Sequence, residues 1–408
     1  MNSGAFKSSV VRCAFIGKFS VLVLGLGTMQ QATAAALNTQ FFTYIYNVCN
    51  AVPIPSSDPA FITMCNQALL TGNGAGGPTP VTAVSANLGT VNAGSGAASR
   101  KKKGMRVPLD EQQEKKDKGA SADGGGWGLL VTPQYGRSNR SETDLENGYQ
   151  SNLSGLVVGL DYRFSDSFVW GVAVGQTKDK ANFNGNVGFL NTSNNTATLY
   201  GTWLYSENVT VDGYLGKGKL NLDNQRQFVF GANVSGMMSG KTTGQQTMAG
   251  LSTSYQADLG RFNVSPFFNL DYIKTTINSY NESGSNVDTN LMALHYGDRG
   301  VSSLTSSLGG RLSTSYGYSW GTLQPSARLA AVHEYQNNAT QSNNELVLTP
   351  GTGFLVATDA PDRNYLNLGV GVSAALNGGT QLFLDYDKRA QDRLLSSWAV
   401  SAGVLVGF

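Results

Sequence analysis

Apolar and polar residues alternate with a period of two along most of the chain after residue 126. In the last segment, "SSWAVSAGVLVGF", one face of an extended strand carries only apolar side chains, because side chains of a strand point alternately to opposite sides. These positions are Trp398, Val400, Ala402, Val404, Val406 and Phe408. An unpaired edge strand with such a face promotes aggregation. The pattern therefore favours a sheet that closes into a barrel and has no free edge.

The same segments carry charges on their second face. In "SGLVVGLDYRF", leucine and valine occupy one face, whereas Asp161 and Arg163 occupy the other. An Arg or Lys on the lipid face near the membrane midplane costs about 2–4 kcal/mol, so we expect the charged face to line a pore. The expected pore-lining residues are Asp161, Arg163, Asp271, Arg311, Arg328 and Asp385.

Turn signals divide the region from Trp127 to Phe408 into an even number of segments, as a transmembrane barrel requires. The twelve predicted strands cover residues 127–137, 152–164, 167–179, 194–205, 208–221, 243–259, 262–276, 300–317, 320–335, 363–376, 379–390 and 396–408. Tight joints such as "FSDSF" and "LNGGTQ" alternate with long polar connections, which we predict as external loops at 225–244 and 337–362. The prediction is an all-β, twelve-stranded antiparallel transmembrane β-barrel.

Composition agrees with a membrane barrel. Charged residues make up 14 % of the chain, and glycine occurs 50 times in 408 residues, whereas soluble domains average about 25 % charge and about 7 % glycine. The net charge of +2 gives no bulk field that would favour nucleic acid. A soluble barrel would show the same alternation with its faces reversed. The glycine-rich polar face and an export signal favour the membrane arrangement.

The N-terminus is predicted to be a secretory signal peptide. Basic residues precede the apolar run "FSVLVLGLG", and small residues follow it in "QATAAALN". The run is about ten residues long, too short for a helix that spans a bilayer, and the small residues predict signal cleavage after Ala34 or Ala36. An exported chain without a long apolar run is expected in the outer membrane of a Gram-negative bacterium. It would reach the periplasm through the Sec translocon.

Several stretches together resemble the autotransporter β-domain, the translocator of type V secretion. They are "GLVVGLDYRFSDSFVWGVAVGQTKD", "ATLYGTWLYSENVTVDGYLGKG", "VSPFFNLDY", "LQPSARLAAVHEY", "SSLGGRLS" and "AGVLVGF". The resemblance spans residues 127–408 and implies a twelve-stranded barrel with a helix in its pore, joined to an exported passenger. It also implies that the barrel-assembly machinery reads the last strand. The matching positions are Phe408, Val406, Val404, Ala402 and Val400; packing against lipid is their alternative role.

Residues 100–126 would then form a basic linker and the pore helix. The segment "MRVPLDEQQEKKDKGAS" predicts a helix, with Pro108 in its first turn, acidic residues near its start and lysines before Gly119. Twelve helical residues span about 18 Å, comparable with an apolar band of about 25 Å. A solvated linker helix outside the pore is the alternative.

The head, residues 37–99, is short. Its first half predicts two short helices around a Pro/Ser turn, and its second half is a flexible low-complexity tail. Cys49 and Cys65 are the only cysteines after the signal, so we expect a disulfide in the oxidising periplasm. The closed loop of about 17 residues would contribute about 3 kcal/mol. No histidine lies nearby, so a metal site is not expected.

Candidate catalytic chemistry is sparse. The two histidines are His295, in an expected external loop, and His333, whose neighbour Glu334 points to the opposite side of a strand. We therefore expect no enzyme activity and no cofactor. The sequence predicts a monomeric autotransporter that exports or displays its own short passenger, in contact with membrane lipid, periplasmic chaperones and the barrel-assembly machinery. The alternative is a structural or surface-binding barrel that acts through its external loops and keeps its head in the periplasm.

Overall fold

The computed structural model describes residues 35–71, 126–143, 146–165, 167–230, 234–336 and 341–408. Strands dominate this part of the chain. The main strands are β1 (Gly126–Arg140), β2 (Tyr149–Ser165), β3 (Phe168–Phe183), β4 (Gly188–Leu204), β5 (Val209–Phe230), β6 (Val234–Tyr255), β8 (Phe262–Ile277), β11 (Arg299–Ser313), β13 (Gly321–Glu334), β16 (Asn364–Leu376), β17 (Thr380–Ala390) and β18 (Leu395–Gly407). Each pairs antiparallel with the next, and β18 pairs with β1. The predicted twelve-stranded closed barrel is confirmed.

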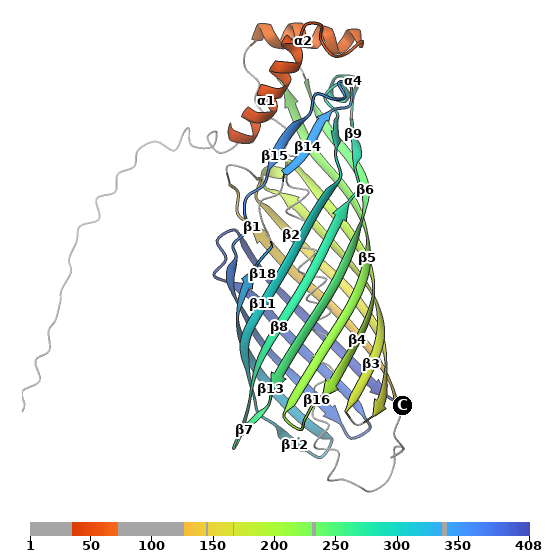
Figure 1. Ribbon diagram of the computed structural model, residues 1–408, viewed down its shortest axis with the longest axis vertical. Coiled ribbons are helices and arrows are strands. Elements are labelled where there is room, and N and C mark those ends of the chain that lie inside the picture. The colour runs from red at the N-terminus through yellow and green to blue at the C-terminus, as the bar shows by residue number, and fades with distance from the viewer. Residues whose placement is uncertain (1–34, 72–125, 144–145, 166, 231–233, 337–340) are drawn as a thin grey trace, which may run out of the picture.

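The barrel has two distinct ends (Figure 1). Short connections join β2 to β3, β4 to β5 and β16 to β17 at the end that holds Phe408, which we call the Phe408 end. At this end lie also the short strands β7 (Ala257–Leu259) and β12 (Tyr316–Tyr318). The opposite end carries the two N-terminal helices and is called the head end. The predicted tight turns after β2 and β16 lie at the Phe408 end. The two long connections, β8–β11 and β13–β16, lie at the head end, but the β3–β4 and β17–β18 connections at that end are also short.

The predicted long polar loops are wrong in one respect: both contain strands. Strand β5 continues to Phe230, and β6 begins at Val234. Most of the 225–244 connection is therefore a hairpin. The 337–362 connection contains β14 (Gln341–Leu346) and β15 (Phe354–Ala357). The β8–β11 connection folds into β9 (Tyr280–Gly284), α4 (Val287–Asn290) and β10 (Leu294–Tyr296). These segments read as loops because their outer faces are polar, although their inner faces bury apolar side chains.

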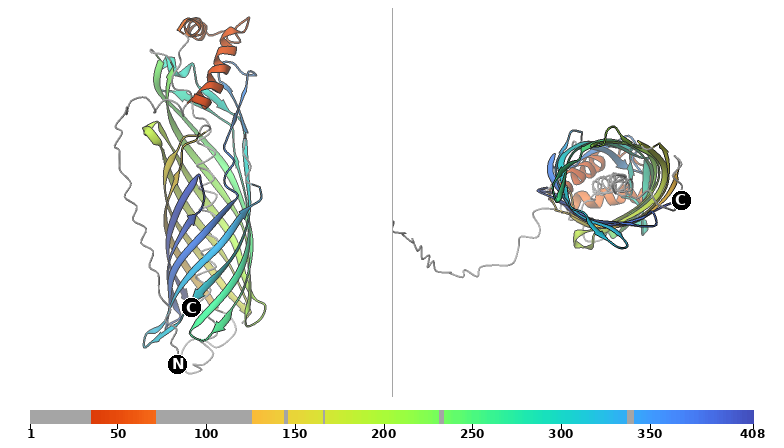
Figure 2. Two further views of the ribbon diagram at one scale, coloured as in Figure 1. Left: turned by 90° about the vertical axis from the view of Figure 1, so that its left-hand side faces the viewer. Right: turned by 90° about the horizontal axis from the view of Figure 1, so that it is seen from below.

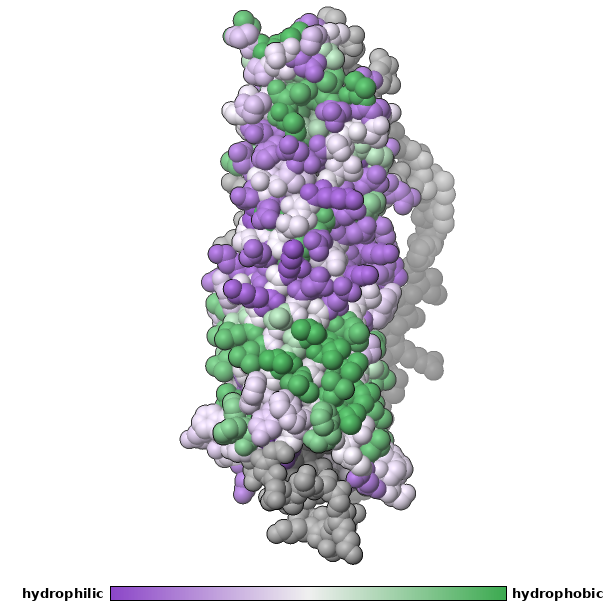
Figure 3. Space-filling view, turned by 90° about the vertical axis from the view of Figure 1, so that its right-hand side faces the viewer, coloured by the Kyte–Doolittle hydropathy of each residue, from purple (hydrophilic) through white to green (hydrophobic). Residues whose placement is uncertain are grey.

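On the face shown in Figure 3, exposed apolar side chains form a band nearer the Phe408 end, below a hydrophilic zone. On four neighbouring strands the band includes Leu156, Val158, Leu160, Trp170, Val172, Val174, Leu199, Trp203 and Leu215. On β2 the band runs from Leu156 to Phe164, about 27 Å along the strand at about 3.4 Å per residue. At a strand tilt of about 40° this is about 20 Å along the axis, close to the apolar band of a membrane barrel.

The head consists of α1 (Ala35–Asn50) and α2 (Pro59–Thr71). A disulfide with an S–S distance of 2.05 Å joins Cys49 to Cys65. Asp58 caps α2, because its carboxylate accepts a hydrogen bond from the backbone N–H of Ala60 at 2.8 Å. Seen along the barrel axis, the two helices lie across the bore (Figure 2). No helix in the described ranges is both long and apolar enough to cross a bilayer.

Several predicted features fall where the structure gives no description. Ala34 and the rest of the predicted signal, the tail of the head after residue 71, and the linker with the pore helix at 107–118 lie outside the described residues. Ala36 belongs to the first turn of α1.

Candidate functional site: the barrel interior and the head-binding surface

Two of the predicted pore-lining carboxylates, Asp161 and Asp271, lie on the inner face and accept hydrogen bonds from tyrosines that lie two strands away. Asp161 is buried and accepts a hydrogen bond from the Tyr200 hydroxyl. The Tyr214 hydroxyl donates to Asp271 across an oxygen–oxygen distance of 2.8 Å. These bonds satisfy polar groups inside the barrel, as a buried carboxylate requires. The tyrosine partners lie 39 and 57 positions away in sequence, so the alternation alone does not identify them.

The predicted basic residues share the inner face. Arg328 forms an ion pair with Asp387, and its guanidinium lies over Gly369, where an added Cβ would come within 2.4 Å of Nη2. An added Cβ at Gly371 would come within 2.4 Å of the buried Asp385 carboxylate. An alanine at either position would therefore require the Arg328 or the Asp385 side chain to shift. The remaining predicted pair, Arg163 and Arg311, is half-buried on the same face.

The predicted assembly-signal residues all lie on β18 or directly after it. Phe408, Val406 and Val404 are exposed, and Val400 and Ala402 are partly buried. Their strand pairs with β17 on one side and with β1 on the other. They thus form part of the outer apolar band at the Phe408 end.

Tyr44 of α1 attaches the head to the hairpin formed by β14 and β15. Its hydroxyl accepts a hydrogen bond from the backbone N–H of Leu346 at 2.9 Å and lies 2.9 Å from Thr352 Oγ1. Its ring stacks on Phe354, with 4.4 Å between ring centroids. The side chain is only 6 % exposed. We call this hairpin, together with the apolar cluster described next, the head-binding surface.

One apolar cluster spans the head and the barrel wall. The head contributes Tyr44, Ile45, Val48, Cys49, Phe61, Met64 and Cys65, and the barrel contributes Phe228, Met238, Tyr280, Leu291, Met292, Leu294, Tyr296 and Leu346. Burying an apolar side chain of this size contributes about 1.5–3 kcal/mol. The two head helices α1 and α2 therefore pack directly against the barrel.

A buried ion pair, Arg226 with Glu282, contacts the head-binding surface through Tyr296. Arg226 on β5 donates two hydrogen bonds to Glu282 on β9, at 2.8 and 2.5 Å. The Tyr296 hydroxyl donates to the same carboxylate at 3.0 Å. The Glu282 carboxylate raises the pKa of Arg226 against the opposing effect of its burial. Burial raises the pKa of Tyr280, which stacks on Tyr296, to about 12.

A second buried cluster fixes the β1–β2 connection at the head end. One guanidinium, that of Arg140, contacts the carboxylates of both Glu146 and Asp359. Burial, together with the nearby Asp359 charge, raises the pKa of Glu146 to about 8, although Arg140 opposes the shift. One cation thus serves two carboxylates, and a proton on Glu146 relieves their repulsion.

The histidines are not arranged for catalysis. His295 Nδ1 lies 2.6 Å from Asn281 Oδ1, and His333 Nδ1 lies 2.7 Å from Asn364 Oδ1. Glu334 points to the other side, where it is buried and accepts a hydrogen bond from the Leu304 backbone N–H at 2.8 Å. Within the described residues, neither histidine lies within ion-pair distance of a carboxylate.

The fold has known counterparts. The structural match with the translocator domain of the autotransporter NalP from Neisseria meningitidis covers 78 % of this chain and 99 % of that domain. Its TM-score is 0.54 and the sequence identity is 14 %. The β-domain of the Bordetella autotransporter Brka gives a TM-score of 0.50 at 20 % identity, over 70 % of this chain and 100 % of that domain. These similarities concern the fold alone.

Sequence relatives are longer than this chain. It is 22 % identical over 263 residues to Lipase 1 of Photorhabdus luminescens, covering 64 % of this chain and 39 % of the lipase. It is 25 % identical over 196 residues to outer membrane protein B of Rickettsia japonica, covering 44 % of this chain and 11 % of that protein. The chain thus spans well under half of either relative. The model of the autotransporter β-domain matches residues 129–387, more than half of the chain, and the chain therefore belongs to the autotransporter family.

Proposed function

We propose that this chain is an autotransporter that exports its own short head through its barrel and displays it at the outer mouth. Family membership makes the barrel an outer-membrane translocator domain of a Gram-negative bacterium. The observation that carries the finer proposal is the packing of Tyr44 and its cluster on the head end, opposite Phe408. If the Phe408 end faces the periplasm, the head lies outside the cell.

The route of the chain supports export through the bore. Helix α2 ends at Thr71 at one end of the barrel, and β1 begins at Gly126 at the other end, beside Phe408. The connecting residues 72–125 include the run "RKKK" and further lysines. A path along the outer wall would take these charges through lipid, where each costs about 2–4 kcal/mol near the midplane. We therefore route the connection through the bore.

This route gives the inner face a role. The segment 107–118, predicted from its sequence as a pore helix, carries acidic residues near its start and lysines near its end. The inner face offers both signs of charge, for example Asp271 and Arg328. In our proposal this helix fills the pore after export. The chain acts as a monomer, follows the Sec route to the periplasm, and depends on chaperones and the barrel-assembly machinery to insert.

Catalysis is not part of the proposal. Lipase 1 is a lipase by name, but the two histidines of this chain contact asparagines and lack a carboxylate partner among the described residues. The display function requires only the barrel, the connection and the head.

The test is an epitope tag beside Asn38, followed by protease treatment of intact cells. Display predicts that the protease removes the tag without permeabilisation, while a periplasmic marker protein remains intact. The alternative, a surface-binding barrel with a periplasmic head, predicts that the tag survives in intact cells and disappears only after permeabilisation. That second result would overturn the proposal.

A further inference from the structure

On several neighbouring strands, the outward side chains change from apolar to polar between one outward position and the next. On β3 the outward positions read Trp170, Val172, Val174, Gln176 and Lys178 from the Phe408 end toward the head end. The apolar band therefore ends between Val174 and Gln176. A sharp boundary of this kind marks the level at which lipid tails give way to headgroups.

Neighbouring strands place their boundaries beside this one. On β5 the outward side chains change from apolar to polar between Leu215 and Lys217. The next outward residue, Lys219, pairs with Asn195 of β4, which in turn pairs with Gln176 of β3. On β8, Lys274 follows the last outward apolar residues. It pairs with Thr247 of β6, which pairs on its other side with Lys217 of β5. The edge of the apolar band in Figure 3 is the visible form of these changes.

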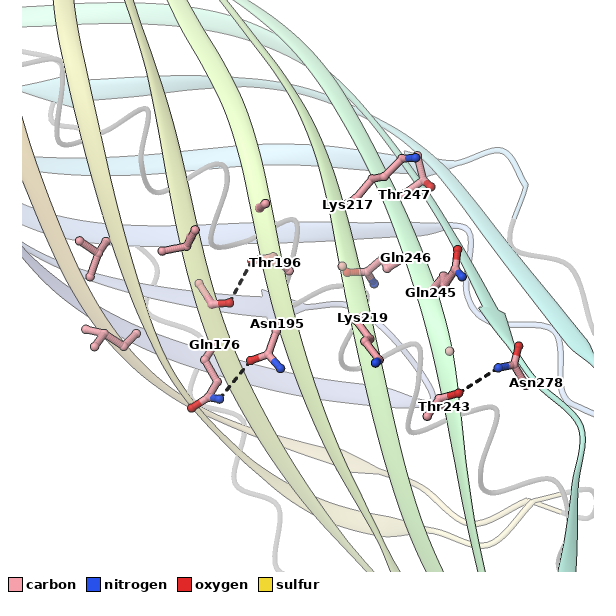
Figure 4. A pocket seen from close by; sticks show the side chains of 17 residues that line it. Gln176, Asn195, Thr196, Lys217, Lys219, Thr243, Gln245, Gln246, Thr247 and Asn278 are labelled. Atoms are coloured by element: carbon pink, nitrogen blue, oxygen red, sulfur yellow. Dashed lines mark hydrogen bonds between the residues drawn. The ribbon is translucent and has the colours of Figure 1, made fainter.

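A groove of about 890 Å³ crosses this boundary on the outer wall (Figure 4). Its apolar part is lined by Leu156, Val158 and Val174, all exposed on the outer face. Ala197, a short side chain between Val174 and Lys217, leaves the space between them open.

The polar part of the groove is lined by Lys217, Lys219 and amide or hydroxyl side chains such as Gln176, Gln245 and Thr247. The lining contains two cations and no carboxylate. In the described part of the chain, neither lysine has a carboxylate within 4.0 Å, whereas Lys241 on β6 has Asp223 at 3.9 Å. Two adjacent, like-charged ammonium groups at the rim of an apolar wall repel each other and favour an anionic ligand.

We propose that this groove binds a membrane lipid with a phosphorylated headgroup. Its acyl chain would lie on the wall of Leu156, Val158 and Val174, and its phosphate would contact Lys217 and Lys219. Both long side chains can extend along the wall toward the headgroup level, and ammonium groups bind phosphate as point charges. A free inorganic anion would leave the apolar wall unused. The lipid is the occupant present at this level all around a membrane barrel.

The experiment measures lipid binding to the full chain, purified in detergent and stripped of lipid, by native mass spectrometry. The probes are bisphosphorylated lipid A and the same lipid without its phosphates. The unmodified protein should bind the phosphorylated probe more tightly. Lys217→Ser/Lys219→Ser should weaken that binding on the order of thirtyfold, because a basic residue at an anionic lipid surface contributes about a factor of five.

The matched control is Lys178→Ser/Lys180→Ser, which removes two outward lysines from β3, above the groove. This variant should bind the phosphorylated probe like the unmodified protein. Heat-dependent migration on a gel verifies that each variant forms a barrel. Equal affinity of the unmodified protein for both probes would overturn the proposal without any variant. Equal losses in the two double variants would also overturn it, because the effect would then belong to surface charge in general.

Discussion

The backbones of Trp127 and Phe408 exchange two hydrogen bonds, from Trp127 N to Phe408 O at 3.0 Å and from Phe408 N to Trp127 O at 2.8 Å. The first strand and the last residue of the chain thus close the barrel at its seam. In a bilayer every unpaired backbone group costs several kcal/mol, so closure up to the last residue removes a real penalty. The seam also brings the side chain of Phe408, which is 72 % exposed, onto the outer wall.

Replacing Phe408 tests whether its ring is recognised during assembly. Phe408→Ser keeps the backbone hydrogen bonds to Trp127 but removes the exposed ring. We expect a marked loss of folded barrel in the outer-membrane fraction, measured by heat-dependent migration on a gel. The control is Phe164→Ser, which removes another exposed ring, 67 % accessible, from the end of β2. If both variants assemble equally well, the ring of Phe408 only packs against lipid.

Tyr44→Phe tests how the head is held. The change keeps the ring stacked on Phe354 but removes the hydroxyl that accepts from the Leu346 N–H. A buried donor left without a partner costs about 1–3 kcal/mol, so we expect faster hydrogen exchange in α1 and in β14. Tyr46→Phe is the control, because Tyr46 is 62 % exposed on the same helix. Unchanged exchange in the Tyr44 variant would mean that the hydroxyl does not hold the head.

Glu282→Gln should destabilise the support beneath the head. Removing one partner of a buried ion pair typically costs about 3–5 kcal/mol, since the Arg226 guanidinium would remain buried without its counter-charge. Hydrogen exchange in β9 and β10 measures this loss. Asp223→Asn removes the exposed partner of Lys241, 3.9 Å away, and should cost at most about 1 kcal/mol. Similar effects of the two changes would contradict the assignment of Arg226 as a buried, pair-dependent cation.

The β1–β2 connection should loosen as pH rises. Burial raises the pKa of Glu146 from 4.5 to about 8, so the folded state holds a proton that the unfolded state releases. The stabilisation is present below about pH 4.5 and is lost as pH rises toward about 8. We expect hydrogen exchange around Glu146, corrected for intrinsic rates, to accelerate over this interval. Glu146→Gln cannot titrate there and should remove the pH dependence; a persistent dependence would assign it to another group.

Sequence reasoning predicts the barrel well because a lipid-facing strand must repeat every two residues. The same rule separates inward Asp161 and Asp385 from their outward neighbours. It fails at the head end, where β5 and β6 leave the apolar band and their outer faces become polar. There only isolated inward residues, such as Phe228 and Met238, carry the signal, and the hairpin resembles a loop.

The contacts between distant segments are beyond a pattern of this kind. Arg226 and Glu282 are separated by 56 positions, and Tyr44 and Leu346 by 302. Their meeting depends on the strand register and on how the hairpins fold over the bore. Composition gives the types of residue available at the mouth of the barrel but not their partners.

The most direct test of the central claim is a photo-crosslink from the head in living cells. A benzophenone amino acid replaces Tyr44 in one variant and Tyr46 in another, and mass spectrometry maps the crosslinked peptides after irradiation. We predict that the probe at position 44 captures the β14–β15 hairpin, residues 341–357, whereas the probe at position 46 does not. Protease added to intact cells should then cut the crosslinked head. A probe at position 44 that never reaches this hairpin, or a crosslinked head that intact cells protect from the protease, would contradict display at the outer mouth.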